Sequence, residues 1–131
     1  VQAHPDFQLV ISYNPGYQSV MKDLKPSTKQ RFVAFDFDYP LPDLEAQIVA
    51  NETGIDSATA TQLVRIAGTA RALKGHGLSE GVSTRLLVYA ALLMRQGVAP
   101  RDACRMAMVR PITDDLDIRQ SLDHAIDACW G

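Results

Sequence analysis

The chain has 131 residues, of which 47% are hydrophobic and 21% are charged, and its formal net charge is −2. This size and composition are those of a globular protein with one or two small domains. The slight negative charge and the lack of a basic stripe argue against nucleic acid as a partner. The longest apolar run, residues 86–94, is too short to cross a membrane.

The two cysteines, Cys104 and Cys129, are not spaced as zinc ligands or as a redox pair. We therefore expect reduced, largely buried thiols in a cytoplasmic protein, and no metal site. The chain begins at Val1 and carries no targeting pattern. We expect it to be a section of a longer protein.

Two strands are predicted in the first third of the chain. Residues 7–13 are almost continuously apolar and end at the turn signal Asn14-Pro15-Gly16, which is typical of a strand buried on both faces of a parallel sheet. Residues 33–39 alternate apolar and acidic side chains, which favours a strand with one polar face. Between them, Pro26 is expected to begin a short helix that ends near Arg31.

Everything after these strands is predicted to be helical. Apolar spacing together with capping residues and glycines indicates a series of helices. Their expected ranges are 43–53, 57–74, 84–96, 100–109, and from a cap at Thr113 or Asp114 to the end of the chain. The helix over 84–96 is apolar nearly all round, so we expect it to be central. The predicted fold is an α/β remnant in residues 1–41 followed by an all-α bundle in residues 42–131.

Three polar residues are candidates for contact with a phosphate group. Asn14 follows a buried strand, where α/β sheets place ligand sites, but asparagine equally suits a turn before proline. Arg31 could stabilise a γ-phosphate across a subunit boundary, or simply face the negative end of a short helix. Arg85 falls in the first turn of a predicted helix, where a cation meets the positive end of the dipole. An anionic ligand and a chance surface position explain Arg85 equally well.

Motifs of other catalytic classes do not occur in the sequence. It contains no Gly-x-x-x-x-Gly-Lys-Ser/Thr loop and no strand that ends in a paired Asp-Glu for magnesium. It also contains no Gly-x-Ser-x-Gly elbow. Asp36 and Asp38 share a strand face, which we interpret as a solvated face rather than a catalytic pair.

Four segments, taken together and in order, resemble the C-terminal half of MoxR-type AAA+ ATPases of the CbbQ/NirQ/NorQ group. They are residues 11–18 (ISYNPGYQ), 24–32 (LKPSTKQRF), 35–40 (FDFDYP) and 81–85 (GVSTR). Each is moderately specific, and the resemblance covers essentially the whole chain. It implies that residues 1–41 are the last strands of a P-loop AAA+ core and that residues 42–131 are a helical lid domain.

The resemblance also implies roles for the three candidate residues. Asn14 takes the sensor-1 place, Arg31 the place of an arginine finger that acts in trans, and Arg85 the sensor-2 place that contacts an ATP phosphate. A ring, usually of six subunits, is implied, with a partner that contains a von Willebrand A domain. Such a chaperone-like ATPase acts on a metalloenzyme, here Rubisco or the nitric oxide or nitrite reductase system.

Both Walker motifs are absent from this sequence. Phosphate cradling and magnesium binding supply much of the nucleotide affinity in this class. We therefore expect ATP and magnesium to bind the full-length protein, and this chain alone to hydrolyse no ATP and to bind it weakly. Two alternatives stay open: a helical interaction module without a nucleotide role, and a denitrification regulatory protein. The second has little support, because no helix-turn-helix with a basic recognition helix is present.

Overall fold

The computed structural model describes residues 2–12 and 26–131. The chain divides into two compact units, Val1–Phe37 and Asp38–Gly131. In the first unit the short helix α1 (Pro26–Lys29) begins at the proline, as expected. The chain turns at its end, where the backbone N–H of Arg31 donates to the carbonyl of Thr28 at 3.1 Å.

Neither of the two expected strands is present in the described residues. Residues 7–12 and 33–39 form no β-ladder, and their apolar side chains are exposed, with Val10 at 85% and Phe37 at 95%. A strand is stable only when its backbone groups bond to neighbouring strands, and the described ranges supply none. The structure thus supports the helical part of the expected fold and not the α/β part.

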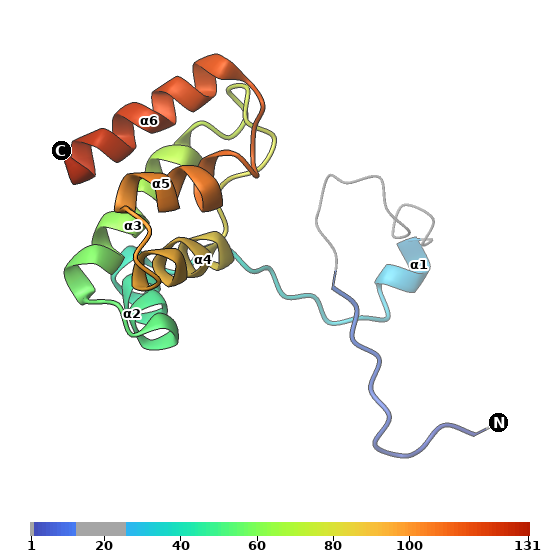
Figure 1. Ribbon diagram of the computed structural model, residues 1–131. Helices are drawn as coiled ribbons and strands as arrows, with labels where there is room; N and C mark the ends of the chain where they lie inside the picture. The colour runs from blue at the N-terminus through green and yellow to red at the C-terminus, as the bar shows by residue number, and fades with distance from the viewer. Residues whose placement is uncertain (1, 13–25) are drawn as a thin grey trace. The chain divides into compact units, whose positions relative to one another are not determined.

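The second unit is built from helices (Figure 1). Their bounds are α2 (Pro42–Thr53), α3 (Ser57–Ala72), α4 (Thr84–Arg95), α5 (Pro100–Cys104), the π-helix η2 (Arg105–Val109) and α6 (Leu116–Trp130). Within the described part of the chain, β pairing is limited to an isolated bridge between Lys74 and Leu78. No helix there is long and apolar enough to span a bilayer.

Local sequence signals set the ends of these helices. Gly54 ends α2 with φ of 70°, a left-handed conformation that glycine adopts without strain. Asp56 caps α3, accepting a hydrogen bond from the backbone N–H of Thr59 at 2.9 Å. Both signals were readable from the sequence, so the loop between α2 and α3 falls where it was predicted.

The predicted cap of the last helix was wrong. Asp115 caps α6, because its carboxylate accepts from the backbone N–H groups of the first turn. The two expected caps have other partners: Thr113 Oγ1 accepts from the N–H of Asp115 at 3.1 Å, and Asp114 pairs with Arg119 at 2.6 Å. Three adjacent polar residues compete for this position, and the sequence does not rank them.

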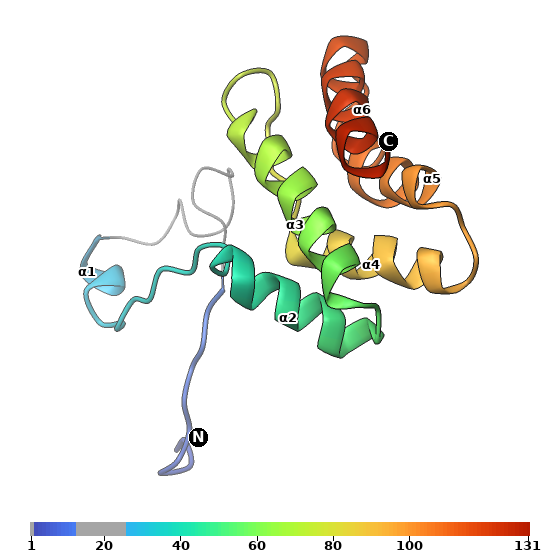
Figure 2. The ribbon, with the colours of Figure 1, turned by 90° about the vertical axis from the view of Figure 1, so that its left-hand side faces the viewer.

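Helix α4 is central, as predicted, since it packs against α2, α3, α5 and η2. Helix α6 packs against α3 and α5 (Figure 2). The side chains that α4 buries completely are Leu87, Ala90 and Ala91. One face of α4 is nevertheless open, because Tyr89 is 50% exposed and Leu92 is 39% exposed. The expectation that α4 is apolar on all sides therefore overstated its burial.

The helix that begins at Pro100 changes its hydrogen-bond pattern at Arg105. From there to Val109 it is a π-helix, and the N–H of Arg110 bonds to the carbonyl of Arg105 at 3.0 Å, five residues back. Wide turns of this kind are rare and frequently occur at functional sites. The predicted range of 100–109 matches α5 and η2 together, but the π-helical turn was not predicted.

Candidate functional site

The candidate site lies at the start of α4. Arg85 is the second residue of the helix, is exposed, and its side chain has no hydrogen-bond or ion-pair partner among the described residues. Ser83 occupies the N-cap position, but its side chain makes no capping bond. The first turn therefore presents a guanidinium together with backbone N–H groups that the Ser83 side chain does not cap, and both attract an anion.

A buried carboxylate lies directly behind this turn. Glu45 on α2 is fully buried, and both of its oxygens accept from Arg71 on α3 at 2.7 Å. The hydroxyl of Thr84 donates to the same carboxylate at 2.6 Å. Arg71 also donates through Nε to the carbonyl of Val82 at 2.8 Å. Side chains from α2, α3 and α4 are thus joined in one network immediately before Arg85.

The network keeps Glu45 ionised. Burial by itself would raise the pKa of this carboxyl group, because a charge is costly away from water. The hydrogen bonds from Arg71 and Thr84, and the positive charge of Arg71, outweigh burial and lower the pKa below its ordinary value. A bidentate guanidinium–carboxylate pair at this position is therefore a charged pair at neutral pH.

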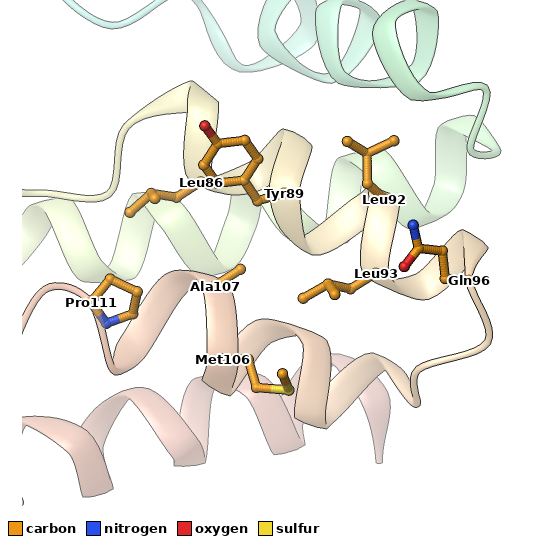
Figure 3. A pocket seen from close by; sticks show the side chains of 8 residues that line it. All are labelled: Leu86, Tyr89, Leu92, Leu93, Gln96, Met106, Ala107 and Pro111. Carbon is orange, nitrogen blue, oxygen red and sulfur yellow. The ribbon is translucent and has the colours of Figure 1, made fainter.

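An apolar groove adjoins this end of α4. We use this name for a cavity of about 480 Å³ between α4 and the segment that follows α5, and Figure 3 shows the side chains around it. Its lining includes Leu86, Tyr89, Leu92, Met106 and Pro111. Leu86 and Pro111 lie toward one end of the groove, and Gln96 lies at the other (Figure 3).

Two exposed arginines are sequence neighbours of residues at one end of the groove. Arg85 directly precedes Leu86, and Arg110 directly precedes Pro111. Both arginines are exposed, and neither side chain has a hydrogen-bond or ion-pair partner among the residues that the structure describes. The lining of the groove itself is almost entirely apolar, with Gln96 as its polar member.

The other predicted site residues are placed less completely. Asn14 lies outside the described residues. Arg31 is exposed in the turn that follows α1, in a different unit from Arg85, so each is described by itself. In residues 2–12 and 26–131, no three His, Cys, Asp or Glu side chains lie together as metal ligands would. Cys104 is buried, Cys129 is partly buried, and both are free thiols.

Glu45 and Arg71 were not among the site residues predicted from the sequence. A signal for them exists: each charged residue falls in the apolar stripe of its helix, Glu45 four residues before buried Val49 and Arg71 four residues after buried Ala67. Residues spaced by four lie on one face of a helix. Two opposite charges on inward faces of adjacent helices indicate a buried pair.

The fold and the site define a small all-helical domain with an exposed arginine at the start of its central helix. Residues 45–129 match the family model described as CbbQ/NirQ/NorQ C-terminal. The chain belongs to this family.

Individual relatives are similar over nearly the whole chain. It is 66% identical over 125 residues to Protein CbbQ of Hydrogenophilus thermoluteolus, covering 95% of this chain and 47% of that protein. It is 52% identical over 131 residues to Protein NorQ of Paracoccus denitrificans, covering 100% of this chain and 48% of that protein. Denitrification regulatory protein NirQ of Pseudomonas aeruginosa is 51% identical over 115 residues, 88% of this chain and 44% of that protein. The chain spans about half the length of the curated relatives it matches.

Proposed function

We propose that this chain is the nucleotide-sensing and lid portion of an ATP-hydrolysing, chaperone-like AAA+ protein. The observation that carries the proposal is Arg85, an exposed cation without a described partner in the first turn of α4. A cation is mildly unfavourable there unless an anion is near, and a nucleotide phosphate is such an anion. Membership in the CbbQ/NirQ/NorQ family supports the same assignment.

Under this proposal two residues of the first unit also have roles toward a nucleotide. Asn14 reads the γ-phosphate as sensor 1, and Arg31 reaches the nucleotide of a neighbouring subunit as an arginine finger. Residues 7–13 and 33–39 become strands when the other strands of an AAA+ core pair with them. In the described parts of these segments, residues 7–12 and 33–39, the large apolar side chains are exposed, which is consistent with that requirement.

The assembly that we propose is a six-membered ring that binds ATP and magnesium and works with a von Willebrand A domain partner. Its client is a metalloenzyme, either Rubisco or an enzyme of the nitric oxide or nitrite reductase system. The printed name of one relative, Denitrification regulatory protein NirQ, supports the denitrification part of this range.

The proposal is tested with the full-length protein. We expect Arg85→Ala to raise the KM for ATP or lower kcat, with the fold retained by circular dichroism. Arg65→Ala is the matched control, because Arg65 is an exposed arginine in the interior of α3 and not at a helix start. Equal ATPase activity in the Arg85 variant, the control and the parent would refute the sensor role.

The role of Arg31 has its own test. If the finger acts in trans, Arg31→Ala subunits still bind ATP but leave the neighbour's site incomplete. Mixing them with subunits that carry an inactivated phosphate loop should recover part of the activity, because some interfaces then contain one intact copy of each part. No recovery in mixed rings, where both parents assemble, would contradict a finger in trans.

The isolated chain should behave differently from the full-length protein. Without the phosphate loop we expect no ATP hydrolysis and only weak ATP binding by these 131 residues. Isothermal titration of the chain with MgATP measures this directly. Micromolar affinity would show that the helical unit itself holds nucleotide and would overturn our division of roles.

A second candidate function is a helical interaction module without a nucleotide role, and the apolar groove favours it. Its apolar lining fits the apolar face of a partner helix. Met106, which is 48% exposed, is the point at which to test this. Met106→Asp should abolish partner binding with ATPase turnover unchanged if this function holds, whereas loss of turnover in Arg85→Ala favours the first.

A further inference from the structure

The network around Glu45 fixes the backbone on both sides of the α4 N-cap. Arg71 holds the carbonyl of Val82 at 2.8 Å, and Glu45 holds the hydroxyl of Thr84 at 2.6 Å. Ser83 lies between these two anchored residues and makes no side-chain capping bond of its own. The direction in which α4 begins is therefore set by the buried pair and not by the usual capping interaction.

The guanidinium of Arg71 also lies over the aromatic ring of Tyr39. Arg71 Cζ lies 3.7 Å from the centroid of the Tyr39 ring, a cation–π contact. Tyr39 is in the segment that leads into α2. One buried charge pair therefore connects the segment by which the chain enters the helical unit with the residue that precedes Arg85.

The packing at this point leaves no spare room. A Cβ atom on Gly81 would lie 2.9 Å from the Tyr39 hydroxyl and 3.0 Å from Arg71 Cγ. A side chain at Gly81 would therefore displace the Tyr39 hydroxyl and shift Arg71 by a few tenths of an ångström. The lack of a side chain at Gly81 is thus what allows Tyr39 and Arg71 to close over the loop before α4.

We propose that Glu45, Arg71 and Thr84 are positioning residues for Arg85, and that Tyr39 links them to the chain segment entering the helical unit. This inference rests on the proposed function, in which Arg85 contacts a nucleotide phosphate. The side chain of Arg85 has no described partner of its own, so its place is determined by the backbone of the first turn. That backbone is held by the hydroxyl of Thr84 and the guanidinium of Arg71.

The hydrogen bond from the Thr84 hydroxyl to Glu45 can be removed by a conservative substitution. Thr84→Val removes the hydroxyl and keeps the β-branched shape, and Thr84→Ser restores the hydroxyl. We expect Thr84→Val to lower kcat/KM for ATP in the full-length protein by up to about 100-fold, the loss that a misplacement of about 1 Å produces. Thr84→Ser should recover most of the activity.

A double-mutant cycle separates positioning from simple support of the fold. If Thr84 acts through Arg85, Thr84→Val should have less than about a twofold effect on kcat/KM in an Arg85→Ala background, because interacting sites are not additive. If Thr84 only supports the fold, the two effects multiply. Multiplying effects, or no recovery with Thr84→Ser, would overturn the positioning role.

Tyr39 is tested with a matched pair of substitutions. Tyr39→Phe keeps the ring over Arg71 and should leave kcat/KM unchanged, whereas Tyr39→Leu removes the π face and should lower it, again with no further effect in the Arg85→Ala background. Equal activity of Tyr39→Leu and Tyr39→Phe would overturn the part of the proposal that concerns Tyr39. Thermal unfolding of each variant, measured alongside, confirms that the assay temperature lies below its transition.

The outcomes distinguish this inference from the proposed function. If Arg85→Ala alone leaves ATPase activity intact, the sensor role fails, and the positioning role fails with it. If Arg85→Ala is defective while Thr84→Val is as active as the parent protein, the sensor role stands and only the positioning inference is wrong.

Discussion

Removing one charge of the buried Glu45–Arg71 pair should destabilise the chain more than removing both charges. Glu45 is 0% exposed and the Arg71 side chain is 15% exposed. Removing one partner of a buried pair costs about 3–5 kcal/mol, because the other charge stays buried without compensation. Arg71→Met should fall at the upper end of this range, since it leaves the carboxylate with Thr84 alone. Glu45→Leu should fall near about 3 kcal/mol, because Arg71 can still reach water.

The double variant Glu45→Leu/Arg71→Met removes both charges and fills the space with apolar side chains of similar volume. It loses the bonds to the Val82 carbonyl and the Thr84 hydroxyl, each worth about 1 kcal/mol. We therefore expect about 2 kcal/mol of destabilisation, less than either single change. Urea unfolding of the chain, followed by far-UV circular dichroism, measures all three. Single changes below about 1 kcal/mol, the range of an exposed pair, or strictly additive effects would refute this reasoning.

Three further predictions concern titration and capping. Folding lowers the pKa of Glu45, so the stability that this carboxylate contributes is present above its ordinary pKa of 4.5 and is lost as the pH falls through its folded pKa. Glu45→Gln should therefore flatten the dependence of the urea midpoint on acidic pH. Parallel curves for the variant and the parent would contradict this. Burial raises the pKa of Cys104 to about 11, so a disulfide reagent at pH 8 should label the partly buried Cys129 first. Equal labelling rates for the two cysteines would argue against burial of Cys104. Asp115→Ala should destabilise the chain by about 1 kcal/mol in thermal unfolding and Asp115→Asn by much less; equal losses would exclude the capping role.

The helices were predictable because their signals are local. Gly54, Asp56 and Pro100 each mark a helix end through the conformation of one residue or one capping bond, and the structure places helix ends beside all three. The position of Arg85 in the first turn of a helix followed from the same kind of signal. What holds that turn in place did not follow, because Glu45 and Thr84 are 39 residues apart in the chain.

The two predicted strands show what a local sequence pattern does not determine. The apolar run over residues 7–13 and the alternation over residues 33–39 are genuine strand patterns, but a pattern does not supply a hydrogen-bonding neighbour. Propensity for strands depends on the surrounding sheet much more than propensity for helices depends on context. The apolar groove was not predicted for a related reason: the helix over 84–96 was expected to be central because it is apolar nearly all round, and only the packing reveals that Tyr89 and Leu92 are exposed.

The π-helical turn in η2 has a consequence for how this domain can vary in length. A π-helix contains one residue more than the α-helix that would span the same turn, so deleting one residue from Arg105–Val109 can leave a continuous helix. Because the surplus residue is absorbed within this one turn, such a deletion keeps the residues on both sides close to their present faces. Ala107, Met108 and Val109 belong to the buried core, whereas Met106 is exposed and lines the groove. Deleting Met106 would therefore remove one side chain from the groove and retain the core residues of this segment.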